Sequence, residues 1–117
     1  MKAVNVLIIG FVWPEPTTTA AGQRMLELIH FFLKQNCNIT FASTAKKNVF
    51  SYPLDSLGVA QKEILLNDSS FDSYLSDNKK DIIIFDRYLT EEQFGWRVAE
   101  NNPEALRILD TEDLHSL

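Results

Sequence analysis

The sequence predicts an α/β domain with a doubly wound, mostly parallel sheet of five strands and helices on both faces. Two aliphatic runs, residues 4–9 and 82–85, have the continuous apolar character of strands that are buried on both sides. Segments with helical periodicity separate the strands, and this alternation is typical of parallel sheets covered by helices. A chain of 117 residues has the size of a single domain, residues 1–117.

The first strand, at residues 4–9, is followed by a polar loop and an amphipathic helix. Two prolines exclude regular structure in the loop, and its three threonines are candidate N-caps. A second strand at residues 39–43 follows the helix, and a right-handed crossover would place it parallel to the first. Apolar side chains recur at i, i+3, i+4 and i+7 on one helical face: Met25, Leu28, Ile29 and Phe32.

The sequence patterns in the middle of the chain are less distinct and predict only short helices and strands. Residues 44–56 are polar and irregular, and we expect a loop with one short helical turn there. Residues 62–66 indicate a short third strand at an edge of the sheet. Capping residues at 67–70 then precede a brief helix.

The last third of the chain completes the sheet. The apolar run at 82–85 predicts a central strand beside the first one. Thr90 and Gln93 match a capping box, so we expect a helix to start at Thr90. Residues 106–109 form the predicted fifth strand. The strand order that fits this succession is 3-2-1-4-5, a Rossmann-like arrangement.

Polar clusters follow the strongest strands, and parallel strands bring their carboxyl ends to one rim of the sheet. These clusters are residues 15–24, Asp86-Arg87 and residues 110–115. Ligands of open α/β sheets bind beyond this rim, next to the N-terminus of the first helix. The convergence of the three clusters predicts a binding site there.

Gly22 and Arg24 stand at the entrance of the first helix, where unpaired N–H groups and the helix dipole attract anions. Gly22 would let a phosphate approach the backbone, and Arg24 could add a bidentate donor. Alternatively, Gly22 only relieves crowding where the helix meets the sheet, and Arg24 is a surface charge. The glycine spacing of dinucleotide-binding and phosphate-binding loops is absent.

Several carboxylates also fall on the rim and could hold Mg²⁺: Asp86, Asp110, Glu112 and Asp113. A metal-dependent phosphohydrolase would carry an acidic nucleophile directly after the first strand, but Gly10 and Phe11 stand there. The acids can instead cap helices or pair with arginines. We therefore expect no metal and no cofactor.

The composition of the chain limits the binding partners and the cellular location that we expect for the protein. Eleven basic and sixteen acidic residues give a formal charge of −5, and no basic stripe is present, so we expect no nucleic-acid partner. Cys37 is the only cysteine and cannot form an internal disulfide, which fits the cytoplasm. No apolar run reaches the ~20 residues of a membrane span, so we expect no transmembrane segment.

Three stretches resemble the N-terminal half of retaining "group 1" glycosyltransferases of the GT-B fold: residues 4–34 with Pro14, Pro16 and Gly22-Gln23-Arg24, the corner Asp86-Arg87-Tyr88, and residues 108–117. The resemblance implies a lobe that mainly shapes the acceptor site of a two-lobed enzyme. A C-terminal lobe, missing from this sequence, would hold most of the nucleotide-sugar donor. The 117-residue chain alone would then be inactive.

The resemblance also implies residue roles. Gly22 and Arg24 would approach the donor phosphates, while other rim residues would line the acceptor side of the cleft. Many relatives carry a histidine where this chain has Glu112 before Asp113, so the histidine's role would pass to Glu112 or to His115. The implied catalytic residues are Glu112 and Asp113, and the implied cleft residues are Trp13, Asp86, Arg87 and His115.

Two further expectations follow. The alternative to a transferase is a non-catalytic binding or interaction module of flavodoxin-like or receiver-like shape, although the acidic pair and lysine of receivers are not evident. If a second lobe and a closing helix are missing, apolar surface near the fifth strand is uncovered, and the isolated lobe would self-associate through it.

Overall fold

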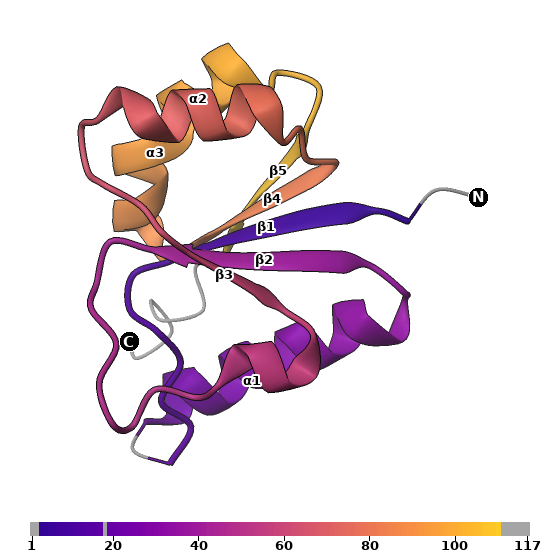
Figure 1. Ribbon diagram of the computed structural model, residues 1–117, viewed down its shortest axis with the longest axis vertical. Coiled ribbons are helices and arrows are strands. Elements are labelled where there is room, and N and C mark those ends of the chain that lie inside the picture. The colour runs from indigo at the N-terminus through magenta and orange to yellow at the C-terminus, as the bar shows by residue number, and fades with distance from the viewer. Residues whose placement is uncertain (1–2, 18, 111–117) are drawn as a thin grey trace.

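The computed structural model describes residues 3–17 and 19–110, and it shows a parallel sheet between helices (Figure 1). The strands and helices alternate along the chain much as the sequence predicts. In order they are β1 (Asn5–Gly10), α1 (Ala20–Lys34), β2 (Asn38–Ser43), the 3₁₀ helix η1 (Leu54–Leu57), β3 (Ala60–Glu63), α2 (Ser69–Asp77), β4 (Ile82–Asp86), α3 (Tyr88–Asn101) and β5 (Leu106–Asp110).

The five strands are all parallel and lie in the order β3-β2-β1-β4-β5, which confirms the predicted doubly wound, Rossmann-like sheet. The most apolar strands, β1 and β4, pair with each other at the centre, with Ile8 beside Ile84. Because the order runs outward from β1 in both directions, β1 and β4 flank the point where the direction of winding changes.

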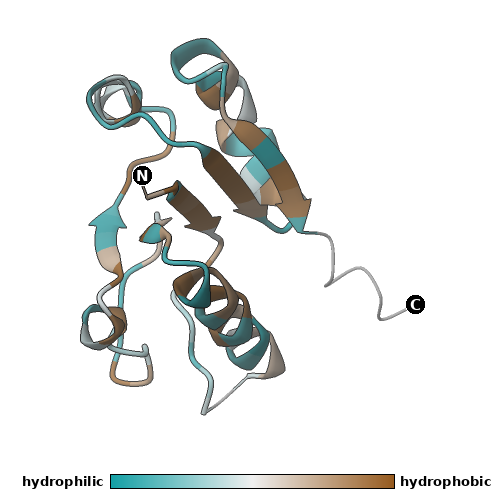
Figure 2. Ribbon diagram, turned by 90° about the vertical axis from the view of Figure 1, so that its right-hand side faces the viewer, coloured by the Kyte–Doolittle hydropathy of each residue, from teal (hydrophilic) through white to brown (hydrophobic). Residues whose placement is uncertain are grey.

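Helices cover the sheet on both faces and divide the core into two layers. Helices α2 and α3 lie on one side and α1 lies on the other (Figure 1). Alternate residues of β1 serve the two layers, since Leu7 packs with Phe94 of α3 while Ile8 packs with Ile29 of α1. The central strands β1 and β4 are accordingly brown in Figure 2, whereas the edge strand β3 is largely teal. Within the described residues, no helix has the length and apolar character needed to cross a membrane.

Two predicted boundaries are wrong. The third strand is Ala60–Glu63 rather than residues 62–66. It pairs only with the end of β2, and its last ladder bond runs from the Ile64 N–H to the Ser43 carbonyl (3.0 Å). Leu65 and Leu66 are exposed beyond that bond, so the apolar run that suggested a strand continues outside the sheet.

The start of α3 is also earlier than predicted, at Tyr88 rather than Thr90. The Thr90 hydroxyl does not cap a new helix. It donates to the carbonyls of Asp86 (2.8 Å) and Arg87 (3.0 Å) in the turn before it. A capping-box pattern was therefore misleading here, because the hydroxyl found acceptors on its N-terminal side.

Candidate functional site

A cavity of about 260 Å³ lies beyond the carboxyl ends of β1 and β4, beside the N-terminus of α1. Three parts of the chain form it: the β1–α1 loop, the first turns of α1, and the turn after β4. The lining residues are Val12, Trp13, Pro14, Glu15, Thr19, Ala21, Gly22, Met25, Asp86 and Arg87.

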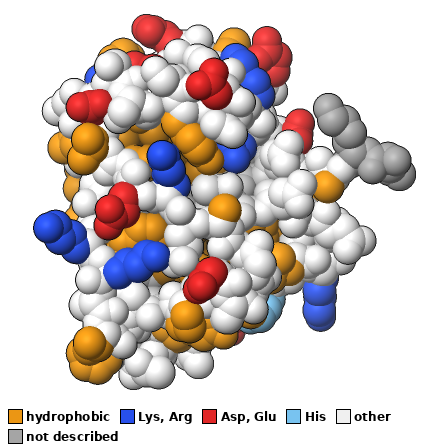
Figure 3. All heavy atoms as spheres, viewed as in Figure 1, with side chains coloured by type: hydrophobic (Ala, Val, Ile, Leu, Met, Phe, Trp, Pro, Cys, Tyr) orange, Lys and Arg blue, Asp and Glu red, His pale blue; other side chains and the backbone are white. Residues whose placement is uncertain are grey.

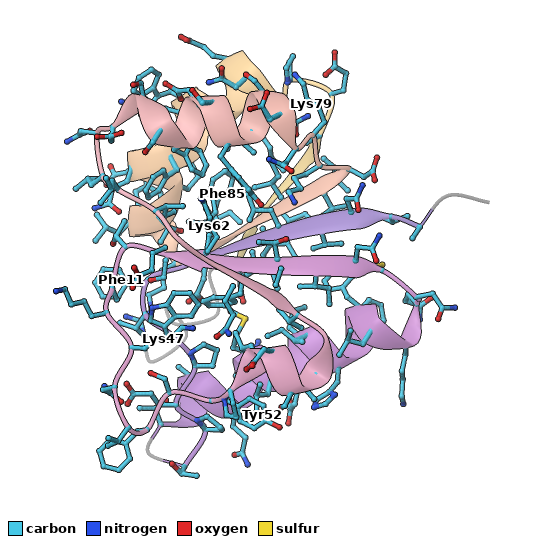
Figure 4. All side chains as sticks on the ribbon, viewed as in Figure 1. Phe11, Lys47, Tyr52, Lys62, Lys79 and Phe85 are labelled. Atoms are coloured by element: carbon cyan, nitrogen blue, oxygen red, sulfur yellow. The ribbon has the colours of Figure 1, made fainter. Side chains whose placement is uncertain are left out.

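Trp13 forms a fixed wall of this cavity. It is only 2% exposed, and its indole N–H donates to the Ala45 carbonyl (2.7 Å). Its ring lies 5.4 Å from that of Phe41, and the Lys47 ammonium lies 4.7 Å from its centroid. These contacts tie the β1–α1 loop to the segment that follows β2, on which Figure 4 labels Lys47.

Gly22 is required by the protein's own packing. A Cβ atom at this position would lie 2.6 Å from the Glu15 nitrogen, so the loop backbone occupies the space that a side chain would need. The Gly22 N–H donates to the hydroxyl of Thr19, the N-cap of α1 (2.9 Å). Gly22 therefore shapes the cavity by letting the loop approach the helix, and its own N–H is already used.

The first turn of α1 still offers donors. Ala21, in this first turn, lines the cavity. The first N–H groups of a helix have no partners within the helix, and together with the positive end of the helix dipole they favour an electronegative ligand atom.

Arg87 enters the cavity from a strained turn. Its backbone has φ 76° and ψ 152°, a region that is essentially restricted to glycine. Its N–H donates to the Asp110 carbonyl (3.0 Å), and its guanidinium lies 5.1 Å from the Phe11 ring. Strained backbone conformations of this kind are found mostly at functional sites, where they hold a side chain in a required position.

The charges that line the cavity are mixed. Glu15 and Asp86 contribute carboxylates, Arg87 contributes a guanidinium, and all three are half-buried. The Asn48 amide donates to the Glu15 carboxylate (2.9 Å). Asp86 stands opposite Asp110 in the β4–β5 register. Within the part of the chain described, no three His, Cys, Asp or Glu residues gather in a group that could hold a metal ion.

The structure brings together four of the eight predicted site residues, since Trp13, Gly22, Asp86 and Arg87 all line this cavity. Arg24 is exposed on α1 and is not one of the lining residues. Glu112, Asp113 and His115 lie outside the described residues.

Sequence reasoning did not single out some of the lining residues. Pro14 was named only for the resemblance and Met25 only for the apolar stripe of the helix, yet both line the cavity. One local feature of the sequence indicates a rigid cavity wall: the succession Trp13-Pro14-Glu15-Pro16, in which two prolines restrict the backbone at the start of the loop.

A second, shallower cavity of about 330 Å³ lies on the other face of the sheet, between α3 and β5. It is lined by Phe85, Glu91, Gly95, Arg107 and Leu109. It shares no lining residue with the rim cavity and contains none of the predicted site residues.

In comparisons with known proteins, no family model, no curated protein and no solved structure matches the chain.

Proposed function

We propose that this domain is the acceptor-side lobe of a glycosyltransferase that transfers a sugar from a nucleotide-sugar donor to an acceptor. The single observation that carries this proposal is the cavity at the carboxyl ends of β1 and β4, with Trp13, Gly22 and Arg87 on its walls. Open α/β sheets bind ligands at this reversal of strand order.

The lining chemistry suits a sugar. Hydroxyl groups can donate to the carboxylates of Glu15 and Asp86 and accept from Arg87, while Trp13 and Met25 supply apolar surface. A fully anionic ligand would meet two carboxylates. The volume of about 260 Å³ is just below the roughly 300–1,000 Å³ of pockets for drug-sized ligands, which favours one sugar unit over a whole nucleotide-sugar.

The donor diphosphate would approach from a second lobe and meet the N-terminus of α1. The first N–H groups of α1 would serve this role, with Arg24 on the same helix and Gly22 setting the shape of the corner. Catalysis in this proposal rests on positioning and on stabilising the departing diphosphate. Glu112 and Asp113 are the proposed catalytic residues, with His115 beside them on the chain.

The test is nucleotide-sugar binding and sugar transfer by the full natural chain that contains this domain. Calorimetry with a panel of nucleotide-sugars identifies a donor, and hydrolysis of that donor then reports turnover. Arg87→Gln should lower kcat/KM by about tenfold or more, the typical effect of losing one hydrogen bond from a charged group. Arg107→Gln removes an arginine at the second cavity and should leave kcat/KM unchanged.

Absence of binding by every nucleotide-sugar would end the proposal. A yellow purified protein that releases a flavin would favour the binding-module alternative instead. Equal losses in the two arginine variants would place the effect outside the rim cavity.

A further inference from the structure

The carboxyl edge of the sheet carries a repeated surface feature. Each of the segments that follow β1, β2, β3 and β4 presents two consecutive large apolar side chains to solvent. Of the thirteen exposed large hydrophobic residues in the described part of the chain, eight belong to these pairs. The pairs are Phe11-Val12, Val49-Phe50, Leu65-Leu66 and Tyr88-Leu89.

The pair after β2 stands at the tip of an ordered turn. Asn48 organises the turn, because its side-chain carbonyl accepts from the Phe50 N–H (2.7 Å) and its N–H donates to the Ser51 hydroxyl (3.0 Å). Its main-chain carbonyl accepts from the Ser51 N–H (3.1 Å). The turn leaves Val49 91% exposed and Phe50 54% exposed. An ordered backbone therefore holds two apolar side chains out in water.

The charge around this tip differs from that of the chain as a whole. Lys46 and Lys47 precede the apolar pair, and the stretch from Thr44 to Leu54 contains no aspartate or glutamate, although the chain has a net charge of −5. Basic, acidic and hydrophobic side chains lie side by side along the edge that carries these loops (Figure 3), and the Glu15 carboxylate accepts from the Asn48 amide (2.9 Å). A surface that complements this tip would have an apolar interior for Val49 and Phe50 and negative charge at its boundary for the lysines.

From this geometry we infer that residues 46–50 anchor the protein to an anionic lipid membrane. Val49 and Phe50 insert at the boundary between headgroups and acyl chains, and Lys46 contacts the lipid phosphates. A protein partner would need roughly 800 Å² of surface, so it would have to cover the other apolar pairs of the carboxyl edge together with the five residues 46–50. A lipid surface deforms around such a tip.

The anchor is joined rigidly to the wall of the rim cavity. The Tyr52 N–H donates to the Pro14 carbonyl (2.8 Å), the Asn48 amide reaches Glu15, and Lys47 lies over Trp13. Figure 4 shows Lys47 and Tyr52 on the segment that runs beside this wall. Membrane binding would therefore fix the orientation of the cavity relative to the lipid surface, whatever ligand the cavity takes.

Sedimentation of the protein with lipid vesicles tests the inference. Vesicles of phosphatidylcholine with phosphatidylserine should bind the protein, and vesicles of phosphatidylcholine alone should bind it much less. Val49→Ser with Phe50→Ser should weaken binding by about tenfold or more. Lys46→Gln should weaken it by about fivefold on the anionic vesicles, and added salt should reduce that difference.

Phe31 on α1 provides a matched control, because it is 55% exposed and lies away from the carboxyl rim. Phe31→Ser should bind vesicles as the wild type does. In a second readout, the fluorescence of Phe50→Trp should shift to the blue when anionic vesicles are added, while that of Phe31→Trp should not.

Three results would overturn the inference: no partition of the wild type onto anionic vesicles, wild-type binding by the Val49→Ser, Phe50→Ser variant, or equal binding to both kinds of vesicle. Concentration-dependent self-association that this double variant abolishes would also overturn it, in favour of a protein occupant.

Discussion

At the scale of single residues, Arg87 combines an unfavourable backbone with a position on the wall of the cavity. Two groups hold its peptide in place: its N–H bonds to the Asp110 carbonyl, and its own carbonyl accepts from the Thr90 hydroxyl. The sequence Asp86-Arg87-Tyr88 predicted a rim residue, but nothing in it signals a positive φ angle, because arginine has no preference for that conformation.

Replacing Arg87 separates backbone strain from side-chain function. Glycine adopts φ 76° and ψ 152° without a steric penalty, whereas alanine keeps the penalty of about 1–3 kcal/mol. Both variants lose the guanidinium. We expect the free energy of unfolding of Arg87→Gly to exceed that of Arg87→Ala by about 1 kcal/mol, measured by urea denaturation. Equal stability of the two variants would show that the turn relaxes.

Gly22 illustrates what the sequence left open. Ligand approach and relief of crowding were both consistent with a glycine there, and the structure assigns the crowding to the backbone of Glu15 rather than to the sheet. A contact between a loop and a helix seven residues later depends on the path of the loop, which local propensity does not specify.

Gly22→Ala should lower the free energy of unfolding by about 1–3 kcal/mol, the usual cost of overpacking against a rigid neighbour. Gly95→Ala on α3 is the matched control. Its Cβ would meet only the end of the flexible Glu91 side chain, and alanine favours the helix by about 1 kcal/mol. Thermal unfolding of both variants checks this. A Gly22→Ala variant as stable as Gly95→Ala would be inconsistent with the described close approach.

At the scale of elements, the sequence located most accurately the strands and the helix that bury a continuous apolar surface. The central strands β1 and β4 and the stripe of α1 bury continuous apolar surface, so their pattern alone locates them. The edge strand β3 and the start of α3 were misplaced because their limits depend on individual hydrogen bonds, those of Ile64 and Thr90.

The position of the cavity could be predicted from the sequence, but the contacts that form its walls could not. Parallel topology brings the ends of β1 and β4 together, which is why Trp13, Gly22, Asp86 and Arg87 could be expected on one rim. The wall itself depends on long-range bonds such as the one from Trp13 to Ala45, between residues that no local pattern connects.

The N-terminus of α2 gives a prediction about pH. Hydrogen bonds from Ser70 to the Asp68 carboxylate lower the pKa of Asp68 below its ordinary value of 3.8. Because the folded pKa is depressed, this contribution to stability is present above the unfolded pKa and is lost as the pH falls through the folded pKa. Asp68→Asn keeps a neutral cap and should remove this part of the acid dependence. Thermal unfolding from pH 5 to pH 2 compares the two proteins, and parallel curves would contradict the assignment.

At the scale of the whole molecule, the two edges of the sheet differ. The β3 edge presents the charged residues Lys62 and Glu63, whereas the β5 edge exposes Leu106 and Ile108 on either side of the exposed Arg107. Charged side chains discourage pairing between sheet edges, and apolar edges promote it. The two exposed apolar residues support the expected self-association of the 117-residue chain through β5.

We expect light scattering to show concentration-dependent association of the 117-residue chain, and Leu106→Lys to abolish it without loss of the fold. The Val49→Ser, Phe50→Ser variant leaves β5 intact and should associate like the wild type. A strict monomer at high concentration would exclude an interface at this edge.

The central claim is that the carboxyl-rim cavity receives a sugar ligand. The most direct measurement is an NMR titration of the ¹⁵N-labelled natural chain with the nucleotide-sugar and acceptor that it binds. The amide signals of Trp13, Gly22 and Arg87 should shift together in a saturable way, while those of Gly95 and Arg107 at the second cavity should stay in place. Shifts confined to the second cavity, or no saturable shift at the rim, would contradict the claim.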